Sequence, residues 1–114
     1  MSYSIVPSED FQKEFKQLSK KYPSLVNDIA NLGNSLKEEP IQGTSLGNNC
    51  YKIRLGIRSK GKGKRGGVRV ITYVQVIKTT IYLLSIYDKS DQENITDQEI
   101  IARIIMLNPQ KKKQ

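Results

Sequence analysis

Apolar and polar residues alternate through the middle of the chain in the pattern of a β-sheet. Between residues 51 and 58 every second residue is apolar, and the intervening residues are Lys, Arg or Gly. This alternation places the apolar side chains on one face of a strand and the basic side chains on the other. Two runs rich in β-branched residues, 68–77 and 80–87, follow after short connections. Together the runs predict a three-stranded antiparallel meander.

Helical periodicity precedes this predicted sheet. After a short candidate strand at residues 3–6, Ser8 is a plausible N-cap, and apolar residues recur every three or four positions through residues 11–22. The same spacing predicts a second helix over residues 25–38. We expect this helical hairpin to cover the apolar face of the sheet. Residues 40–49 are rich in turn formers and lack periodicity, so we expect a loop there.

A third, shorter helix is predicted after the sheet. Thr96 and Glu99 have the spacing of a capping box, and the strongly apolar segment that follows them ends near Pro109. Residues 110–114 form a basic tail that we expect to be disordered. The order of elements predicts an α+β fold with an N-terminal strand, an αα-hairpin, the meander and a short C-terminal helix, in a single domain over residues 1–109.

Positive charge is concentrated on the predicted meander. The chain has a net charge of +8 at pH 7. Between Pro40 and Tyr87 it contains no Asp or Glu, whereas nine basic residues lie there. Such a segment is typical of a surface that binds a polyanion. The nine residues are Lys52, Arg54, Arg58, Lys60, Lys62, Lys64, Arg65, Arg69 and Lys78.

The composition excludes several kinds of site. The chain has no His and a single cysteine, Cys50, which excludes an internal disulfide, a conventional zinc site and a His-based catalytic triad. Any catalysis must therefore use Lys, Arg, Tyr or a carboxylate, and we expect neither a metal nor an organic cofactor. Because we find neither a membrane span nor the apolar segment of a signal peptide, we expect a cytoplasmic protein.

Two short motifs lie in the meander and at its end. The segment GKRGGVRVITYV contains Gly66-Gly67-Val68-Arg69, and IYLLSIYDKSDQENITDQEI contains Tyr87-Asp88-Lys89. Together with the upstream segment LGNNCYKIRL, these motifs resemble the RelE/ParE superfamily of bacterial type II toxins. The resemblance is closest to the RelE and HigB-like ribosome-dependent ribonucleases, and it spans nearly the whole chain.

This resemblance implies cleavage of mRNA in the ribosomal A site and a cognate antitoxin protein that masks the toxin, in a toxin–antitoxin hetero-oligomer. It implies that Arg69 stabilises negative charge on the scissile phosphate. RNA brings its own nucleophile, the 2′-hydroxyl, so a protein that orients it and neutralises the phosphate suffices for cleavage. The other positions that the resemblance implies for catalysis are Lys89, Lys52, Arg54 and Tyr87.

A further set of residues is a candidate RNA-binding surface. The Gly- and Lys-rich stretch around residues 59–67 is typical of a cationic loop that contacts phosphates without sequence specificity. Its candidate contacts are Arg58, Lys60, Lys62, Lys64 and Arg65. Tyr73 is a second candidate, beside Tyr87, for stacking on a base, although strand tyrosines more often fill the edge of a core.

Two other functions remain open at this point. A ParE-like toxin of the same fold inhibits DNA gyrase and cleaves nothing, and a non-catalytic RNA-binding relative needs only the basic surface. Arg69 also has a structural interpretation, as a member of a salt bridge. The cleavage hypothesis requires Arg69, Lys89, Lys52 and Arg54 to lie on one face of the sheet.

Overall fold

The computed structural model describes residues 2–59 and 66–107, and it confirms the predicted α+β fold. No helix in this part of the chain combines the length and the hydropathy that a membrane span requires. In chain order the elements are β1 (Ser4–Pro7), α1 (Glu9–Lys21), α2 (Leu25–Glu38), β2 (Thr44–Gly47), β3 (Cys50–Leu55), β4 (Val68–Gln75), β5 (Thr80–Asp88) and α3 (Asp97–Met106).

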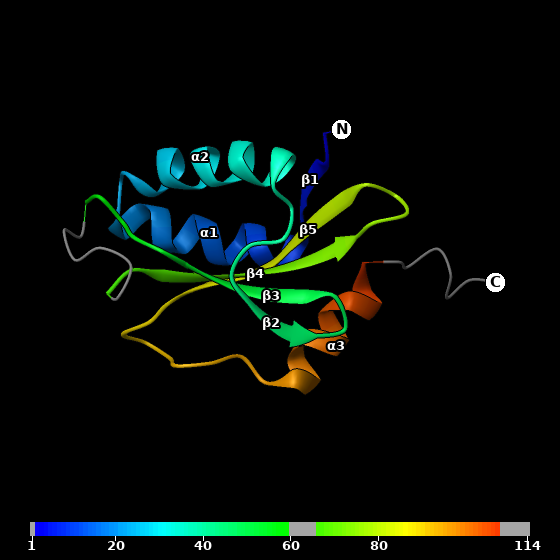
Figure 1. Ribbon diagram of the computed structural model, residues 1–114. Helices are drawn as coiled ribbons and strands as arrows, with labels where there is room; N and C mark the ends of the chain where they lie inside the picture. The colour runs from blue at the N-terminus through cyan, green and yellow to red at the C-terminus, as the bar shows by residue number, and fades with distance from the viewer. Residues whose placement is uncertain (1, 60–65, 108–114) are drawn as a thin grey trace.

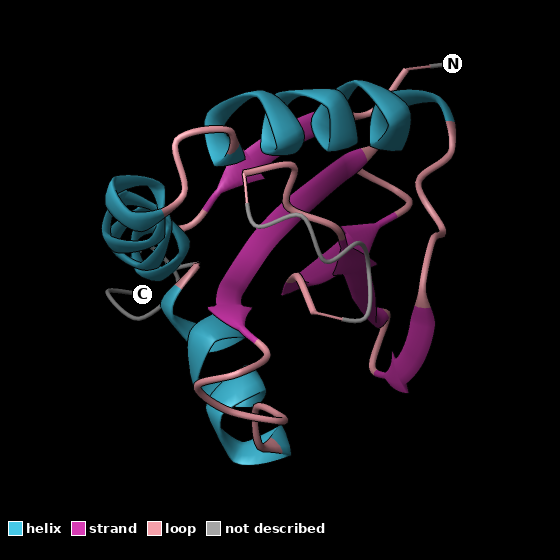
Figure 2. Cartoon of the chain, turned by 90° about the vertical axis from the view of Figure 1, so that its left-hand side faces the viewer, coloured by secondary structure: helices cyan, strands magenta, loops and turns pink. Residues whose placement is uncertain are grey.

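The five strands form one twisted sheet in the order β1-β5-β4-β3-β2. The predicted meander is present, since β3 pairs with β4 and β4 with β5 in antiparallel fashion, while β1 pairs with β5 in parallel. Helices α1 and α2 lie on one side of the sheet and α3 lies on the other (Figure 1). A view turned by 90° shows the same sheet twisting between these helices (Figure 2).

The expectation of a loop through residues 40–49 is wrong in part, because β2 lies inside that segment. β2 is only four residues long and pairs with β3, with Thr44 opposite Lys52. A strand of four residues is too short to show a clear alternation of apolar and polar residues, and its conformation is set by its pairing with β3. Gly43 precedes it with a φ of +91°, and a side chain there would collide with the carbonyl oxygen of Lys52.

Two predicted strands are shorter than expected. β3 ends at Leu55 rather than at residue 58, although Ile57 remains buried. β4 ends at Gln75 rather than at residue 77, and Ile77 is 99% exposed in the turn that leads to β5. In both cases an apolar residue extended the sequence pattern past the last backbone pairing.

The helical hairpin covers the apolar face of the sheet, as predicted. Ser8 caps α1 by accepting a hydrogen bond from the backbone N–H of Phe11, with an N···O distance of 3.0 Å. The main core lies between these helices and the strands. Its buried members are Phe11, Tyr22, Leu25, Leu32, Leu36, Ile53, Ile57, Val68, Val70, Val74, Ile81, Leu83 and Ile86.

The opposite face of the sheet carries a second, smaller core beneath α3. Nearly every residue of β4 and β5 is buried, so both faces of these strands are covered. Residues from β3, β4 and β5 meet Ile95 and Ile100 there. The strand members are Cys50, Ile71, Leu84 and Tyr87.

An ion pair fixes α3 against α1 at the edge of the sheet. Arg103 donates from both of its terminal nitrogens to the carboxylate of Glu14, at 2.9 Å each. The hydrogen bond to Glu14 raises the pKa of Arg103. Glu14 also accepts from the hydroxyl of Ser85 and from the backbone N–H of Ile86, where the pairing of β4 with β5 is irregular. One carboxylate therefore joins α1, β5 and α3.

Candidate active site

A row of polar side chains crosses three strands on the sheet face opposite α1 and α2. Arg54 of β3 is paired directly with Arg69 of β4, and Arg69 is paired with Tyr87 of β5. Lys52 lies two residues before Arg54 and therefore on the same face. This row lies on the sheet face that α3 covers in part, and its Tyr87 also belongs to the second core.

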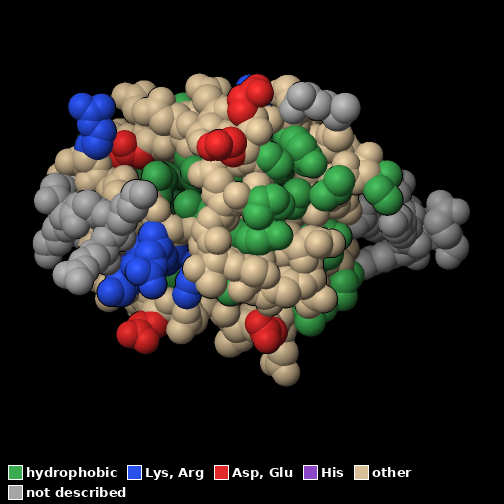
Figure 3. Space-filling view, in the orientation of Figure 1, with side chains coloured by type: hydrophobic (Ala, Val, Ile, Leu, Met, Phe, Trp, Pro, Cys, Tyr) green, Lys and Arg blue, Asp and Glu red, His purple; other side chains and the backbone are tan. Residues whose placement is uncertain are grey.

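The basic side chains surround a hollow of about 460 Å³, which we call the cationic pocket. Lys and Arg side chains gather on this part of the surface in the space-filling view (Figure 3). Its lining comes from β3, from β4 and from the segment that follows β5. The residues that line it are Lys52, Arg54, Arg69, Lys89, Glu93 and Asn94.

Lys89 reaches the pocket because the chain turn after β5 is held in place. Its backbone N–H donates to the carbonyl oxygen of Gly67 at 3.2 Å. The preceding residue, Asp88, is buried and accepts a hydrogen bond from the hydroxyl of Tyr22 at 2.7 Å. Asp88 also accepts from the backbone N–H and the hydroxyl of Ser90, at 3.0 and 2.7 Å. The buried carboxylate thus anchors the turn that presents Lys89.

The glycine pair before β4 has a steric role in the site. A side chain at Gly67 would collide with the backbone carbonyl of Leu55. Only glycine lets the start of β4 approach the end of β3 this closely. Gly67 therefore permits the strand pairing that places Arg69 opposite Arg54.

The pocket brings like charges together, one of them on a buried side chain. Arg69 is only 4% exposed, and burial lowers its pKa, as does the neighbouring charge of Arg54. Burial raises the pKa of Tyr87, while the positive charge of Arg69 opposes that shift. Like charges held together in a partly dehydrated site gain most from a phosphate placed between them.

Comparison with known proteins identifies the family. The model for the RelE toxin of the RelE/RelB toxin–antitoxin system matches residues 5–106. The chain belongs to the RelE toxin family. This agrees with the family resemblance that the Gly66-Gly67-Val68-Arg69 and Tyr87-Asp88-Lys89 motifs indicated.

Solved structures agree with the fold of this RelE-family chain. A mutant of E. coli RelE in the free state is 22% identical, with a TM-score of 0.59, over 82% of this chain and 90% of that one. A chain of the intact E. coli RelBE toxin–antitoxin complex is 20% identical, with a TM-score of 0.58, over 76% of this chain and 96% of that one. A chain of the RelBE2 toxin–antitoxin complex from Mycobacterium tuberculosis is 13% identical, with a TM-score of 0.56, over 77% and 99%.

The structure brings together most of the predicted catalytic positions of this RelE-family chain. Lys52, Arg54, Arg69 and Lys89 all line the cationic pocket. Tyr87 lies beside Arg69 in the row, but its ring is buried in the second core, and its hydroxyl donates to the carbonyl oxygen of Glu93 at 3.5 Å.

Other predicted residues lie elsewhere or outside the described residues. Arg58 is in the turn after β3, where its backbone N–H donates to Asp28 of α2, and it does not line the pocket. Tyr73 does not line the pocket; it stacks on Tyr82 with ring centroids 6.0 Å apart and is partly buried against the second core. The candidate contacts Lys60, Lys62, Lys64 and Arg65 lie outside the described residues, as does the predicted tail.

Sequence reasoning did not predict the contribution of Glu93 and Asn94. Both lie in the polar segment between β5 and α3, which carries no periodic pattern. Asn94 accepts a hydrogen bond from the ammonium of Lys52 at 3.0 Å. The sequence signal for this segment was Ile95, an apolar residue among polar ones. In the structure Ile95 is buried beneath α3 and brings the segment back to the sheet. Among the described residues, no cluster of His, Cys, Asp and Glu side chains is suited to hold a metal ion.

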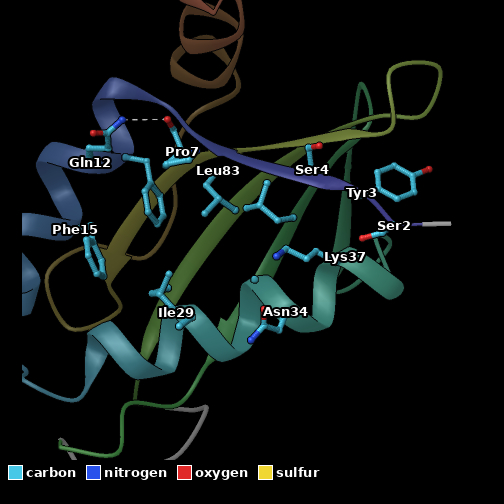
Figure 4. Close-up of a pocket in the computed structure, with 14 residues that line it drawn as sticks. Ser2, Tyr3, Ser4, Pro7, Gln12, Phe15, Ile29, Asn34, Lys37 and Leu83 are labelled. Carbon is cyan, nitrogen blue, oxygen red and sulfur yellow. Dashed lines mark hydrogen bonds between the residues drawn. The ribbon is translucent and has the colours of Figure 1, made fainter.

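A larger hollow of about 1070 Å³ lies elsewhere, between β1 and the two N-terminal helices (Figure 4). Apolar side chains such as Phe15, Ile29 and Leu83 point into it, and Gln12 closes one end by donating to the carbonyl oxygen of Pro7 at 3.2 Å. It gathers no set of charged side chains comparable to that of the cationic pocket. Of these two hollows, the smaller one therefore carries the cluster of charged side chains.

Proposed function

We propose that this RelE-family toxin is a ribosome-dependent endoribonuclease that cleaves mRNA in the A site and so inhibits translation. The observation that carries the proposal is the convergence of Lys52, Arg54, Arg69 and Lys89 on one pocket. These residues come from three separate segments of the chain. A generic basic surface needs no such convergence, whereas stabilisation of one reacting phosphate does.

The proposed reaction uses the 2′-hydroxyl of the RNA as nucleophile. Its oxygen attacks the adjacent phosphorus, the bond from phosphorus to the 5′-oxygen breaks, and the products are a 2′,3′-cyclic phosphate and a free 5′-hydroxyl. Arg69 is the main stabiliser of the charge that develops on the phosphate, because a guanidinium stays charged and offers paired donors. Arg54, directly across the strand pair, adds a second guanidinium.

The remaining predicted residues take supporting roles in this proposal. Asn94 holds the ammonium of Lys52, and the turn after Asp88 fixes the backbone of Lys89 at the pocket, so both residues are in place before RNA arrives. Tyr87 contributes by supporting the segment that contains Glu93 rather than by stacking on a base, since its ring is buried. The basic stretch from Arg58 to Arg65 is proposed to contact ribosomal RNA phosphates.

We also propose a protein partner, a cognate antitoxin that forms a hetero-oligomer with this chain in the cytoplasm. Support comes from the family model and from two structural neighbours that are toxin–antitoxin complexes. The net charge of +8 favours a partner with an acidic binding segment. The gene next to that of the toxin is expected to encode a small acidic or helix-turn-helix protein.

Primer extension on cellular mRNA after induction of the protein tests the proposed activity. Cleavage within the codons of translated messages is the expected result. Gyrase-trapped DNA breaks without mRNA cleavage would instead indicate a ParE-like inhibitor. The absence of both mRNA cleavage and DNA breaks would indicate a non-catalytic relative. Induction of Arg69→Ala at the same level of expression provides the matched control.

A further inference from the structure

A carboxylate is buried at the end of β5, directly before Lys89. Asp88 is the last residue of this strand, and its side chain is 0% exposed. Its backbone pairs with Val68 of β4, and the pairing continues past the strand because the N–H of Lys89 donates to the carbonyl oxygen of Gly67 at 3.2 Å. A carboxylate removed from solvent costs free energy unless hydrogen-bond donors compensate it. The donors to Asp88 therefore determine what this end of the sheet is attached to.

One oxygen of this carboxylate is bound by the end of α1. Oδ2 of Asp88 accepts from the hydroxyl of Tyr22 at 2.7 Å, and the ammonium of Lys21 lies 4.0 Å away. Tyr22 is the C-cap residue of α1, is only 8% exposed and packs in the main core. A phenylalanine would fill the same apolar space, whereas the hydroxyl adds a short hydrogen bond to a carboxylate. This hydroxyl therefore connects the end of α1 to the end of β5.

The other oxygen and the backbone of Asp88 fold the turn that contains Lys89. Oδ1 accepts from the backbone N–H and the hydroxyl of Ser90, at 3.0 and 2.7 Å. The carbonyl oxygen of Asp88 accepts from the backbone N–H groups of Asp91 and Gln92, at 3.0 and 3.2 Å. Among the described residues, none holds the ammonium of Lys89 by a hydrogen bond or an ion pair. The placement of Lys89 at the pocket thus depends on its backbone, and that backbone is folded around Asp88.

We propose that Tyr22 is a positioning residue of the cleavage site, because its hydrogen bond to Asp88 fixes the turn that places Lys89 at the pocket. This inference rests on the proposed ribonuclease function and extends the site to a helix residue that does not line the pocket. Without the hydroxyl, Asp88 loses a donor and the turn loses an attachment to α1. A displacement of about 1 Å at a reacting site can cost about 10²-fold in rate. Removal of this one oxygen atom should therefore slow cleavage although every side chain of the pocket is still present.

The kinetic test is single-turnover cleavage of mRNA on programmed ribosomes by the full-length Tyr22→Phe protein, with the rate at saturation expressed per folded molecule. We expect this rate to fall roughly 10–10²-fold, with the apparent affinity for the ribosome nearly unchanged because the charges of the pocket remain. In a Lys89→Ala background, Tyr22→Phe should cause no further loss, since a hydroxyl that acts through Lys89 then has nothing left to position. A general weakening of the fold would instead lower the rate by the same factor in both backgrounds.

Hydrogen exchange of the free protein provides a readout that is independent of activity. Tyr22→Phe should accelerate exchange at the backbone amides of residues 89–92 and leave the amides at the centre of β4 unchanged. Tyr82→Phe is the matched control, because the hydroxyl of Tyr82 forms no hydrogen bond within the described part of the chain and Tyr82 does not line the pocket. This control should cleave and exchange as the wild type does.

Three results would overturn the role of Tyr22 alone, beside an active wild type. They are a full cleavage rate in Tyr22→Phe, an equal fold-loss when Tyr22→Phe is added to Lys89→Ala, and unchanged exchange at residues 89–92. Where Lys89→Ala cleaves too slowly for the comparison, the exchange rates decide. An inactive wild type would overturn the proposed function together with this inference.

Discussion

The two faces of the central sheet are built for different purposes. The face under α1 and α2 is closed by a continuous apolar core, in which Leu25, Leu36 and Ile81 are fully buried. On the other face the short helix α3 covers one part of the strands, and the part beyond it carries Arg54 and Arg69 side by side. Because successive strand residues point to opposite faces, stability and chemistry are encoded by neighbouring positions.

One strand can therefore contribute to both stability and the candidate site with little interference between the two. In β4, Val68 and Val70 belong to the main core, whereas Arg69 between them lines the cationic pocket. Except at Tyr22, substitutions on the helix-covered face should therefore change the free energy of unfolding and leave the chemistry intact. Substitutions in the pocket should do the reverse.

The largest difference between the effect on cleavage and the effect on stability is expected at Arg69. Arg69→Ala should lower the cleavage rate roughly 10²–10³-fold, about 3 to 4 kcal/mol of barrier, by analogy with the loss of an oxyanion donor. The cleavage rate of Arg69→Lys should lie between those of the wild type and Arg69→Ala, because lysine keeps the charge and loses the paired donors. Single-turnover assays with programmed ribosomes measure this effect, and thermal unfolding checks the fold. Lys16→Ala, an exposed charge on α1, is the control, and equal losses in both variants would refute a specific role for Arg69.

The converse experiment removes a side chain from the main core. Leu36 is fully buried near the end of α2, and Leu36→Ala should lower the free energy of unfolding by about 2–5 kcal/mol. Urea denaturation measures the loss. Val26→Ala, at a position that is 54% exposed on the same helix, should change stability by less than about 0.5 kcal/mol. The cleavage rate per folded molecule should be unchanged in both variants. A large fall of this rate in Leu36→Ala would show that the two faces of the sheet are coupled.

Alkaline pH should weaken the second core through Cys50. Burial raises the pKa of its thiol from 9.0 to about 11. The folded protein therefore holds this proton more tightly than the unfolded chain does, so the thiol favours folding below about pH 9 and loses that contribution as pH rises toward 11. The slope should be at most about 1.4 kcal/mol per pH unit. Urea denaturation across this range should show a flatter curve for Cys50→Ala, and identical curves would contradict the burial of the thiol.

The smallest effect is expected at the cap of α3. Thr96 accepts a hydrogen bond from the backbone N–H of Glu99 at 3.1 Å, and Thr96→Ala should lower stability by about 1 kcal/mol. Hydrogen exchange should localise the change to amides of α3, because the main core lies on the other face of the sheet. Thr96→Ser should restore the protection. Uniform acceleration of exchange across α1 and α2 would show that α3 and the main core unfold as one unit.

Much of this architecture follows from local patterns. Helical spacing predicts α1 and α2, and alternation predicts which face of β3 carries Lys52 and Arg54. β2 was not predicted, because a four-residue strand is defined by its partner rather than by its own residues. The position of α3 on the face that carries the site also depends on a long-range pair, Arg103 with Glu14, which no local pattern reports.

The basic residues of the candidate site could be predicted from the sequence, whereas its acidic residue, Glu93, could not. Arg69 and Lys89 stand in short motifs at strand ends, and the structure places them at one pocket. Glu93 stands in an irregular segment of polar residues, and it comes to the pocket only because Ile95 is buried beneath α3 and Asn94 reaches Lys52. The sequence therefore indicated a carboxylate-free basic surface, whereas the folded chain places one carboxylate beside it.

The most direct test of the central claim is the chemistry of the RNA ends produced by the purified protein on programmed ribosomes. We predict a 2′,3′-cyclic phosphate on one fragment and a 5′-hydroxyl on the other from the wild type, and a loss of both products in Arg69→Ala. Intact mRNA after incubation with the folded wild-type protein, or undiminished cleavage by Arg69→Ala, would contradict the account.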